Sequence, residues 1–500
     1  MSTAPCQSDP GESLDSLRER IRGLREAMAP LEPDSSQREA LGAQALGHAL
    51  AYLDQVPEAP ANRPWAEVFS KRLEPEFPEA GRDPAAILDY VAATVDRPGF
   101  ATTSPRFMAY IPGGGLFHSA LGDLLAAASN KYSGFASASP GAVRLENATT
   151  QWLASVVGYP EGAAGTLTSG GSLANLAAIV AARDALDPDG GGAVYHSRFA
   201  HHCVDKALHI AGRGKAPRRP IGTDSGCRMS PAALEEALEA DVTAGIRPWL
   251  VVASAGTVDT GAVDPLAEIA ALCRRFGAWF HVDGAYGGLF ALCEEGRKRL
   301  SGIEQSDSVA VDPHKTLFLP YGTGAVLVRE GGHLLSAFSA SADYLQPLGE
   351  SEVGPSPADL SPELTRHFRA MRLWLPLQLA GVGAFRAAQS EKLALARYFH
   401  ARLEALDGFD AGPPPDLSVV AFRYRPKSGD SDAFNERLLQ RLQSEGRVML
   451  SGTRIDGRFT LRCAILSFRT HIEHVDEVVA ALLRGVARLE SQPGEASAAG

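Results

Sequence analysis

The feature that most constrains the fold is an alternation of short apolar stretches and helix-like stretches between about residues 100 and 330. The segments "RPWLVVASAGT", "AWFHVDGAYGG", "SVAVDPHK" and "GTGAVLVRE" read as strands, and "DPLAEIAALCRRFG" reads as one of the intervening helices. Strands rich in Val, Ala and Leu are typical of sheets that are buried on both faces, and alternation with helices favours parallel pairing. The pattern therefore predicts an α/β domain built on a mostly parallel sheet.

The segments that flank this block follow other patterns. Apolar residues spaced three or four apart from Leu14 to Met28 predict an amphipathic helix that ends at Pro30, and a second helix is predicted from about Gln37 to Leu53. A short terminal helix is only marginally stable alone, so we expect it to pack on its own chain or on a partner subunit. Towards the C-terminus, "SVVAFRYR", "RVMLSG" and "RFTLRCAIL" alternate with helices and predict a smaller α+β unit.

Composition excludes several classes of protein. The formal net charge is −11 and no Lys/Arg cluster stands out, which argues against nucleic acid or an anionic membrane as the main partner. No apolar run is long enough to span a bilayer, and the first residues lack the pattern of a secretory signal. The six cysteines are far apart and form no C-x-x-C pair, so neither a disulfide framework nor a zinc site is expected. The sequence predicts a soluble cytoplasmic protein.

Two strand ends carry residues suited to an anion and a cation. In "TSGGSLANL", Gly170 and Gly171 allow a tight turn and Ser172 opens a helix, whose free amides suit a phosphate, although a plain glycine turn with a serine cap explains the segment equally well. Asp283 in "HVDGAYGG" ends an apolar strand, where a carboxylate needs a partner such as a protonated pyridine nitrogen; a turn aspartate bound to backbone amides is the alternative.

Two further strand ends carry a lysine and histidines. Lys315 lies between two apolar runs, where we expect burial to lower its pKa and make it a nucleophile for aldehydes, unless it is a surface lysine with a buried stem. His201 and His202 follow a strand, so an imidazole there would stack on a flat cofactor or bind a metal. His196 and His209 lie nearby, but no carboxylate or cysteine has convincing ligand spacing, which disfavours metal. Together the four features indicate pyridoxal 5′-phosphate (PLP).

These segments, in this order along the chain, resemble the group II PLP-dependent decarboxylases, the aromatic-L-amino-acid and glutamate decarboxylase relatives, and "HVDGAYGG" and "DPHK" are the most specific of them. The resemblance runs from about residue 85 to 485. It implies the fold type I, aspartate-aminotransferase-like architecture, with a mostly parallel seven-stranded sheet in the large domain, a smaller C-terminal α+β domain, and a homodimer. It divides the chain into a dimer-swapped N-terminal helical arm, a large PLP-binding domain, a small C-terminal domain and a disordered tail: residues 1–97, 98–375, 376–490 and 491–500.

The same resemblance implies roles for individual residues. Lys315 would form the Schiff base with the cofactor, His314 would contact the phosphate or the substrate carboxylate, and His201 would stack on the ring. The remaining residues that it places around the cofactor are Gly170, Gly171, Ser172, Thr257, Asp283 (at the pyridine nitrogen), Ala285 (against the ring) and Asp312. Three positions depart from the animal enzymes: Asp312 replaces an asparagine, and Gly284 and Gly287 replace alanines.

The resemblance also bears on the reaction. "SASADYLQ" resembles the family's mobile catalytic loop, which puts Tyr344 at the position of a proton-donating tyrosine; the related aldehyde synthases have phenylalanine there. The resemblance also implies that the active sites lie at the dimer interface. Four apolar residues are expected to line the substrate pocket and to favour an aromatic amino acid, unless they are plain core: Phe107, Tyr110, Ile111 and, from the partner subunit, Phe135. Decarboxylation of an acidic amino acid, with Arg106 as the recognition residue, is the first alternative, and an aldehyde synthase or an aminotransferase on the same fold is the second.

Overall fold

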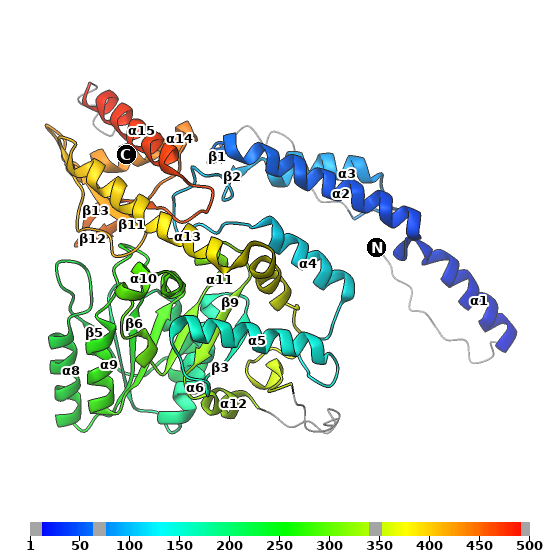
Figure 1. Ribbon diagram of the computed structural model, residues 1–500, viewed down its shortest axis with the longest axis horizontal. Coiled ribbons are helices and arrows are strands. Elements are labelled where there is room, and N and C mark those ends of the chain that lie inside the picture. The colour runs from blue at the N-terminus through cyan, green and yellow to red at the C-terminus, as the bar shows by residue number, and fades with distance from the viewer. Residues whose placement is uncertain (1–12, 64–76, 340–352, 492–500) are drawn as a thin grey trace. The chain divides into compact units, whose positions relative to one another are not determined.

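The computed structural model describes residues 13–63, 77–339 and 353–491 (Figure 1). The chain forms two compact units, one of residues 1–56 with 65–98 and one of residues 57–64 with 99–500. Among the described helices, none is both long and apolar enough to cross a membrane.

The first unit is helical, as its sequence pattern predicts. Its main helices are α1 (Leu14–Ala27), α2 (Ser35–Gln55) and α3 (Pro84–Val91). The Ser13 side chain caps α1, and Asp34 forms a capping box with Gln37 at the start of α2. No residue of α1 or α2 is buried, so the apolar stripe of α1 has no partner within the described chain.

The large part of the second unit is built on a seven-stranded sheet. In spatial order the strands are β3 (Ala164–Thr168), β9 (Gly324–Val328), β8 (Ser308–Val311), β7 (Trp279–Gly284), β6 (Pro248–Ser254), β4 (Ala193–Ser197) and β5 (Arg218–Ile221). Only β9 is antiparallel to its neighbours, and the other pairs are parallel. The predicted mostly parallel sheet is confirmed.

Helices cover both faces of this sheet, which explains why its strands are apolar throughout. One face packs against α5 (Pro140–Val157), α8 (Pro231–Thr243) and α9 (Leu266–Phe276), and the other against α6 (Gly171–Leu186), α7 (Cys203–Leu208) and α12 (Gly331–Phe338). Alternate residues of β6 enter the two cores, Val251 and Ala253 on the first face and Leu250 and Val252 on the second. Figure 1 shows α8 and α9 side by side over the β5–β6 end of the sheet.

A smaller C-terminal α+β part follows, as predicted. Its antiparallel sheet has the order β10 (Phe409–Asp410), β11 (Val419–Tyr424), β13 (Arg458–Ala464) and β12 (Ser451–Ile455). It packs against the helices α13 (Ala370–Glu404), α14 (Ser431–Glu445) and α15 (Ile472–Glu490). The long helix α13 crosses the predicted boundary at residues 375 and 376 and has a non-helical residue, Gly381, in its course.

The glycines that replace alanine after Asp283 have a structural reason. A Cβ at Gly287 would collide with the carbonyl oxygen of Ala255 and with Leu417, and one at Gly284 would lie 3.1 Å from the Ala310 oxygen. Gly287 therefore lies too close to the residue after β6 for a side chain, and Gly284 packs tightly against β8.

Candidate active site

The predicted residues meet at one edge of the large sheet. Strands β3, β4, β6, β7 and β8 all point the same way, so the residues that follow them gather at their carboxyl ends. There they line a cavity of about 560 Å³. Its lining includes every residue that the sequence assigned to the cofactor: Gly170, Gly171, Ser172, His201, Thr257, Asp283, Ala285, Asp312, His314 and Lys315.

Lys315 lies one turn after Asp312 and forms an ion pair with it, with Nζ 2.9 Å from Oδ2. Burial is the largest single influence and acts to lower the pKa of the Lys315 ammonium. The charge and hydrogen bond of Asp312, with the charge of Asp283, outweigh it, so the pKa is raised above its ordinary value. The expected lowered pKa of Lys315 is therefore wrong, because the sequence argument considered only the apolar neighbours of the lysine and not Asp312.

Asp283 is the penultimate residue of β7 and is 8% exposed. Its Oδ1 accepts a hydrogen bond from the Ala285 amide (3.2 Å), and no Lys, Arg or His side chain in the described chain forms an ion pair with it. A buried carboxylate that faces a cavity with so little compensation favours a cationic partner there.

The turn between β3 and α6 brings backbone close to Asp312. A Cβ on Gly171 would lie 2.8 Å from the Ala285 Cβ and 2.9 Å from Asp312 Oδ2, so only glycine fits. The first amides of α6 have no partner within the helix and face the cavity end of the sheet, which suits an anion. Asp312 Oδ1 is buried and has no hydrogen-bond partner among the described residues.

The two predicted histidines are both held neutral by burial. Burial lowers the pKa of His201, against the opposing charge of Asp283, and its Nδ1 accepts a hydrogen bond from the Cys203 amide (3.2 Å). Burial also lowers the pKa of His314, whose Nδ1 donates to the Thr323 carbonyl oxygen (2.6 Å). His201 thus presents a flat uncharged ring to the cavity. In the part of the chain that the structure describes, no three His, Cys, Asp or Glu side chains gather as a metal would require.

Only part of the expected substrate pocket lies at this cavity. Tyr110 and Ile111 line it, whereas Phe107 is 2% exposed and packs in a core with Ala61, Ala109 and Met449. Phe107 is therefore not among the residues that line this cavity: the ring faces inward because residues 107–109 pair with the segment around Met449.

The other expected pocket residues lie elsewhere. Phe135, which is expected to reach the partner subunit's pocket, stacks on Tyr132 with ring centroids 6.1 Å apart and does not line the cavity of its own chain. Arg106 is buried and donates to Glu477 (2.7 Å) and to the Pro57 carbonyl oxygen, so it is not available to a substrate in this cavity. Tyr344 lies outside the described residues.

Sequence reasoning missed a buried hydrogen-bond chain behind the cavity. Asn175, one helical turn after Gly171, donates to the Gly171 carbonyl oxygen (2.9 Å) and pairs with His281 Nε2 (2.7 Å). His281 Nδ1 in turn meets Ser308 Oγ (2.8 Å), and burial lowers the pKa of His281 to about 4. His281 lies two residues before Asp283 and so on the same side of β7, which is the signal that could have revealed it.

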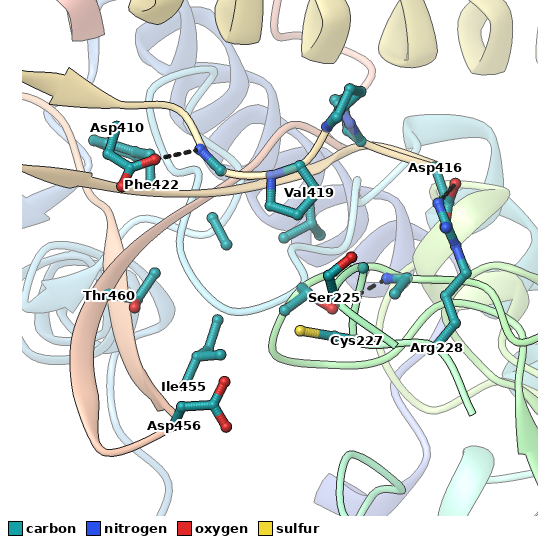
Figure 2. A pocket seen from close by; sticks show the side chains of 18 of the residues that line it. Ser225, Cys227, Arg228, Asp410, Asp416, Val419, Phe422, Ile455, Asp456 and Thr460 are labelled. Carbon is teal, nitrogen blue, oxygen red and sulfur yellow. Dashed lines mark hydrogen bonds and ion pairs between the residues drawn. The ribbon is translucent and has the colours of Figure 1, made fainter. Parts of the chain in front are cut away.

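A second cavity, of about 260 Å³, lies between the small sheet and a loop of the large domain (Figure 2). Ser225, Cys227 and Arg228 face β10–β11 and the β12–β13 hairpin across it, and Arg228 forms a paired hydrogen bond with Asp416 (2.9 and 2.8 Å). None of the predicted site residues lines this second cavity.

The cavity has one group for each part of PLP. The lysine fits the aldehyde, and the buried carboxylate without a cation fits the ring nitrogen. The neutral flat imidazole fits the ring face, and the glycine turn at a helix N-terminus fits the phosphate. The fold and this site define a PLP-dependent enzyme of fold type I. The chain belongs to the pyridoxal-dependent decarboxylase family, whose conserved-domain model matches residues 68–425. It is a PLP-dependent amino-acid decarboxylase.

Similar proteins include an aromatic-L-amino-acid decarboxylase of Bacillus atrophaeus, 33% identical over 90% of this chain and 95% of the relative. A phenylacetaldehyde synthase of Arabidopsis thaliana is 31% identical over 78% of this chain and 84% of the relative. Among solved structures, that of Oryza sativa TDC with PLP and tryptamine superposes with a TM-score of 0.84 at 28% identity, covering 92% of this chain and 99% of the other.

The raised pKa of Lys315 leads to a prediction for Asp312→Asn. Without the carboxylate the Lys315 pKa should fall, because burial then acts with less opposition. Condensation with PLP needs the neutral amine of Lys315. The condensation rate of Asp312→Asn should therefore begin to rise at a lower pH than that of the wild type. The measurement is borohydride trapping of the adduct on apoenzyme across a pH series. Asp456→Asn, at an exposed ion pair with Arg198, is the control; a rise at unchanged or higher pH in Asp312→Asn would contradict the assignment.

Proposed function

We propose that the enzyme decarboxylates an aromatic L-amino acid to the corresponding amine and CO2. The observation that carries this proposal is the character of the cavity wall: Tyr110 and Ile111 line it, and among its described lining residues there is no arginine. Recognition of an acidic side chain needs a cation, and Arg106, the sequence's candidate, is engaged by Glu477. Two of the similar proteins also support an aromatic substrate: the aromatic-L-amino-acid decarboxylase of Bacillus atrophaeus and the Oryza sativa TDC solved with PLP and tryptamine.

The cofactor would be held by residues that the cavity brings together. Lys315 would bind its aldehyde, Asp283 its ring nitrogen, and His201 and Ala285 the two faces of the ring. Gly170, Gly171, Ser172, Thr257 and His314 would surround its phosphate side. When bound, PLP supplies an aldehyde that condenses with amines and a protonated ring that accepts the electron pair released as CO2 departs.

The chain's own residues would manage charge and protons during turnover. Asp283 would keep a proton on the ring nitrogen, since a buried carboxylate stabilises an adjacent cation. His201, neutral at its lowered pKa, would add no positive charge beside the ring. Asp312, whose Oδ2 lies 2.9 Å from Lys315 Nζ, would hold the lysine ammonium in the cavity whenever the amine is not bound to the cofactor.

The test is a panel of the twenty amino acids with DOPA and 5-hydroxytryptophan, with identification of any amine formed. We expect amine from aromatic members only, and Lys315→Ala should lose both amine formation and the borohydride-reducible visible absorbance of the bound cofactor. Lys298→Ala, at an exposed lysine paired with Glu294, should keep both. Amine from glutamate or aspartate alone would refute the aromatic assignment, and a reducible adduct in Lys315→Ala would refute the role of the lysine.

We propose that Tyr344 donates the proton that converts the decarboxylated substrate to amine. The support is its match to the family's tyrosine, and general acids of this kind typically contribute roughly 10²–10⁴-fold in rate. Tyr344→Phe should therefore shift product from amine toward aldehyde, ammonia and hydrogen peroxide, with dissolved O2 as the two-electron oxidant and water as the source of the aldehyde oxygen. Quantifying amine and aldehyde together measures this shift. Unchanged amine output in Tyr344→Phe would show that another group supplies the proton. It would also show that the residue at position 344 does not decide between decarboxylase and aldehyde synthase.

We further propose that the enzyme is a homodimer whose N-terminal helices cover the partner subunit. The support is the apolar stripe of α1, where Ile21 is 56% and Leu24 62% exposed. The double variant Ile21→Asp with Leu24→Asp should sediment as a monomer or a weakened dimer, because two buried charges at an interface are costly. Arg22→Asp, on the polar side of α1, should sediment like the wild type. A fully dimeric double variant would contradict the proposal.

A cytoplasmic location is the last proposal. Its support is that the five cysteines within the described chain, Cys203, Cys227, Cys273, Cys293 and Cys463, are buried and unpaired, as in reducing compartments.

A further inference from the structure

Arg462 is a buried cation at the junction between the small sheet and the active-site cavity. It lies on β13, is 3% exposed, and its guanidinium donates four hydrogen bonds. One goes to Ser451 Oγ of β12 (2.8 Å). The other three go to backbone carbonyl oxygens of the large domain: Asp259 (2.9 Å), Tyr110 (3.3 Å) and Val258.

The absence of a countercharge makes this arginine unusual. Burial lowers the pKa of Arg462, with the charge of Asp259 opposing it, and no carboxylate in the described chain lies within ion-pair distance. A buried guanidinium without an ion pair is costly unless most of its donors are satisfied. Here carbonyl oxygens from two separate segments satisfy them, and each of those segments borders the cavity.

The first segment contains Tyr110. Its backbone has a φ of 55°, in the left-handed region that residues with a side chain seldom occupy. The small domain holds both of its backbone polar groups: the Tyr110 amide donates to Ser451 Oγ (3.2 Å), and its carbonyl oxygen accepts from Arg462. The conformation that places Tyr110 on the cavity wall is therefore maintained from outside the large domain.

The second segment is the loop after β6. Thr257, which lines the cavity and is 1% exposed, is joined to Thr260 through their hydroxyl groups (2.8 Å). Arg462 binds the carbonyl oxygens of Val258 and Asp259 inside this loop, and Asp259 Oδ1 also accepts a hydrogen bond from Thr453 Oγ1 of β12 (2.5 Å). One guanidinium thus ties the substrate wall at Tyr110 to the cofactor wall at Thr257.

We propose that Arg462 is a positioning residue that sets the spacing between Tyr110 and the Thr257 loop and so fits the cavity to a flat aromatic side chain. This inference rests on the proposed function for its substrate class. Lysine cannot replace the arginine, because an ammonium lacks the planar fork that reaches several carbonyl oxygens at once. Ser451 takes part as the acceptor that links Arg462 to the Tyr110 amide.

The experiment compares Arg462→Lys and Ser451→Ala with Arg423→Lys in the holoenzyme. Arg423 is a matched control, since it lies on the neighbouring strand β11, is partly buried, and donates only within the small domain, to Ser431, Asp432 and the Phe459 carbonyl oxygen. Ser451→Ala also covers the case in which Arg462→Lys fails to fold. The readouts are the cofactor absorbance, kcat and KM for an aromatic substrate and for leucine, and hydrogen exchange in peptides spanning residues 107–112 and 256–262.

We expect Arg462→Lys to keep the cofactor absorbance while KM for the aromatic substrate rises about tenfold or more, with kcat changed by less than about threefold. The ratio of kcat/KM for the aromatic substrate to kcat/KM for leucine should fall by about tenfold in Arg462→Lys. Both peptides should exchange faster in Arg462→Lys, and the 107–112 peptide should do so in Ser451→Ala. Arg423→Lys should match the wild type in all of these.

Exchange at wild-type rates in both segments of Arg462→Lys, or a KM no higher than that of Arg423→Lys, would overturn the inference. A wild-type enzyme that forms no amine from aromatic substrates would instead refute the proposed function. The exchange measurement would still decide whether Arg462 holds the two segments.

Discussion

The ion pair between Lys315 and Asp312 is the interaction on which the site depends. It places a cation within a cavity lined by apolar strand ends, which is stable only because Asp312 is adjacent and Asp283 contributes charge from the next strand. That arrangement requires β7 and β8 to be parallel neighbours with their carboxyl ends level, and the register of Asp283 with Ala310 provides this. The surrounding glycines follow from it, because Gly171 and Gly324 leave no room for a side chain beside Asp312.

The two parts of the second unit contribute different properties to the site. The large sheet supplies every group assigned to the cofactor, and all of them follow strand ends, where backbone geometry is rigid. The small domain supplies no residue that lines the cavity, yet Ser451, Thr453 and Arg462 hold the backbone of segments that do. Cofactor binding is thus encoded in the sheet, and the shape of the substrate wall depends on how the small domain packs against it.

The sequence predicted the strands, the sheet type and the strand-end features around Gly171, His201, Asp283 and Lys315 because each depends on local pattern, whereas the remaining cofactor residues were named from the family resemblance. Apolar runs followed by Gly, Asp or Lys identify strand ends without knowledge of their neighbours. Properties set by distant residues were beyond such reasoning. Phe107 faces a core because it pairs with Met449, and the chain from Gly171 through Asn175 to His281 joins residues more than a hundred positions apart. The raised pKa of Lys315 is an intermediate case. Asp312 lies only three residues away in the sequence, but only the structure shows that its carboxylate points at the Lys315 ammonium.

The similarity to both a decarboxylase and an aldehyde synthase shows which features decide the reaction. A cavity that binds PLP and releases CO2 serves either outcome, because the two reactions differ only in what reaches the decarboxylated carbon: a proton or oxygen. If Asp283, His201 and Lys315 act on the ring and the amine as proposed, none of them makes that choice. The choice would then fall to the group that delivers a proton to the decarboxylated carbon, and a tyrosine differs from a phenylalanine by one ionisable hydroxyl. On that proposal a single substitution would change the outcome of the reaction while the sheet, the cofactor residues and the hydrogen bonds of Arg462 stay as they are.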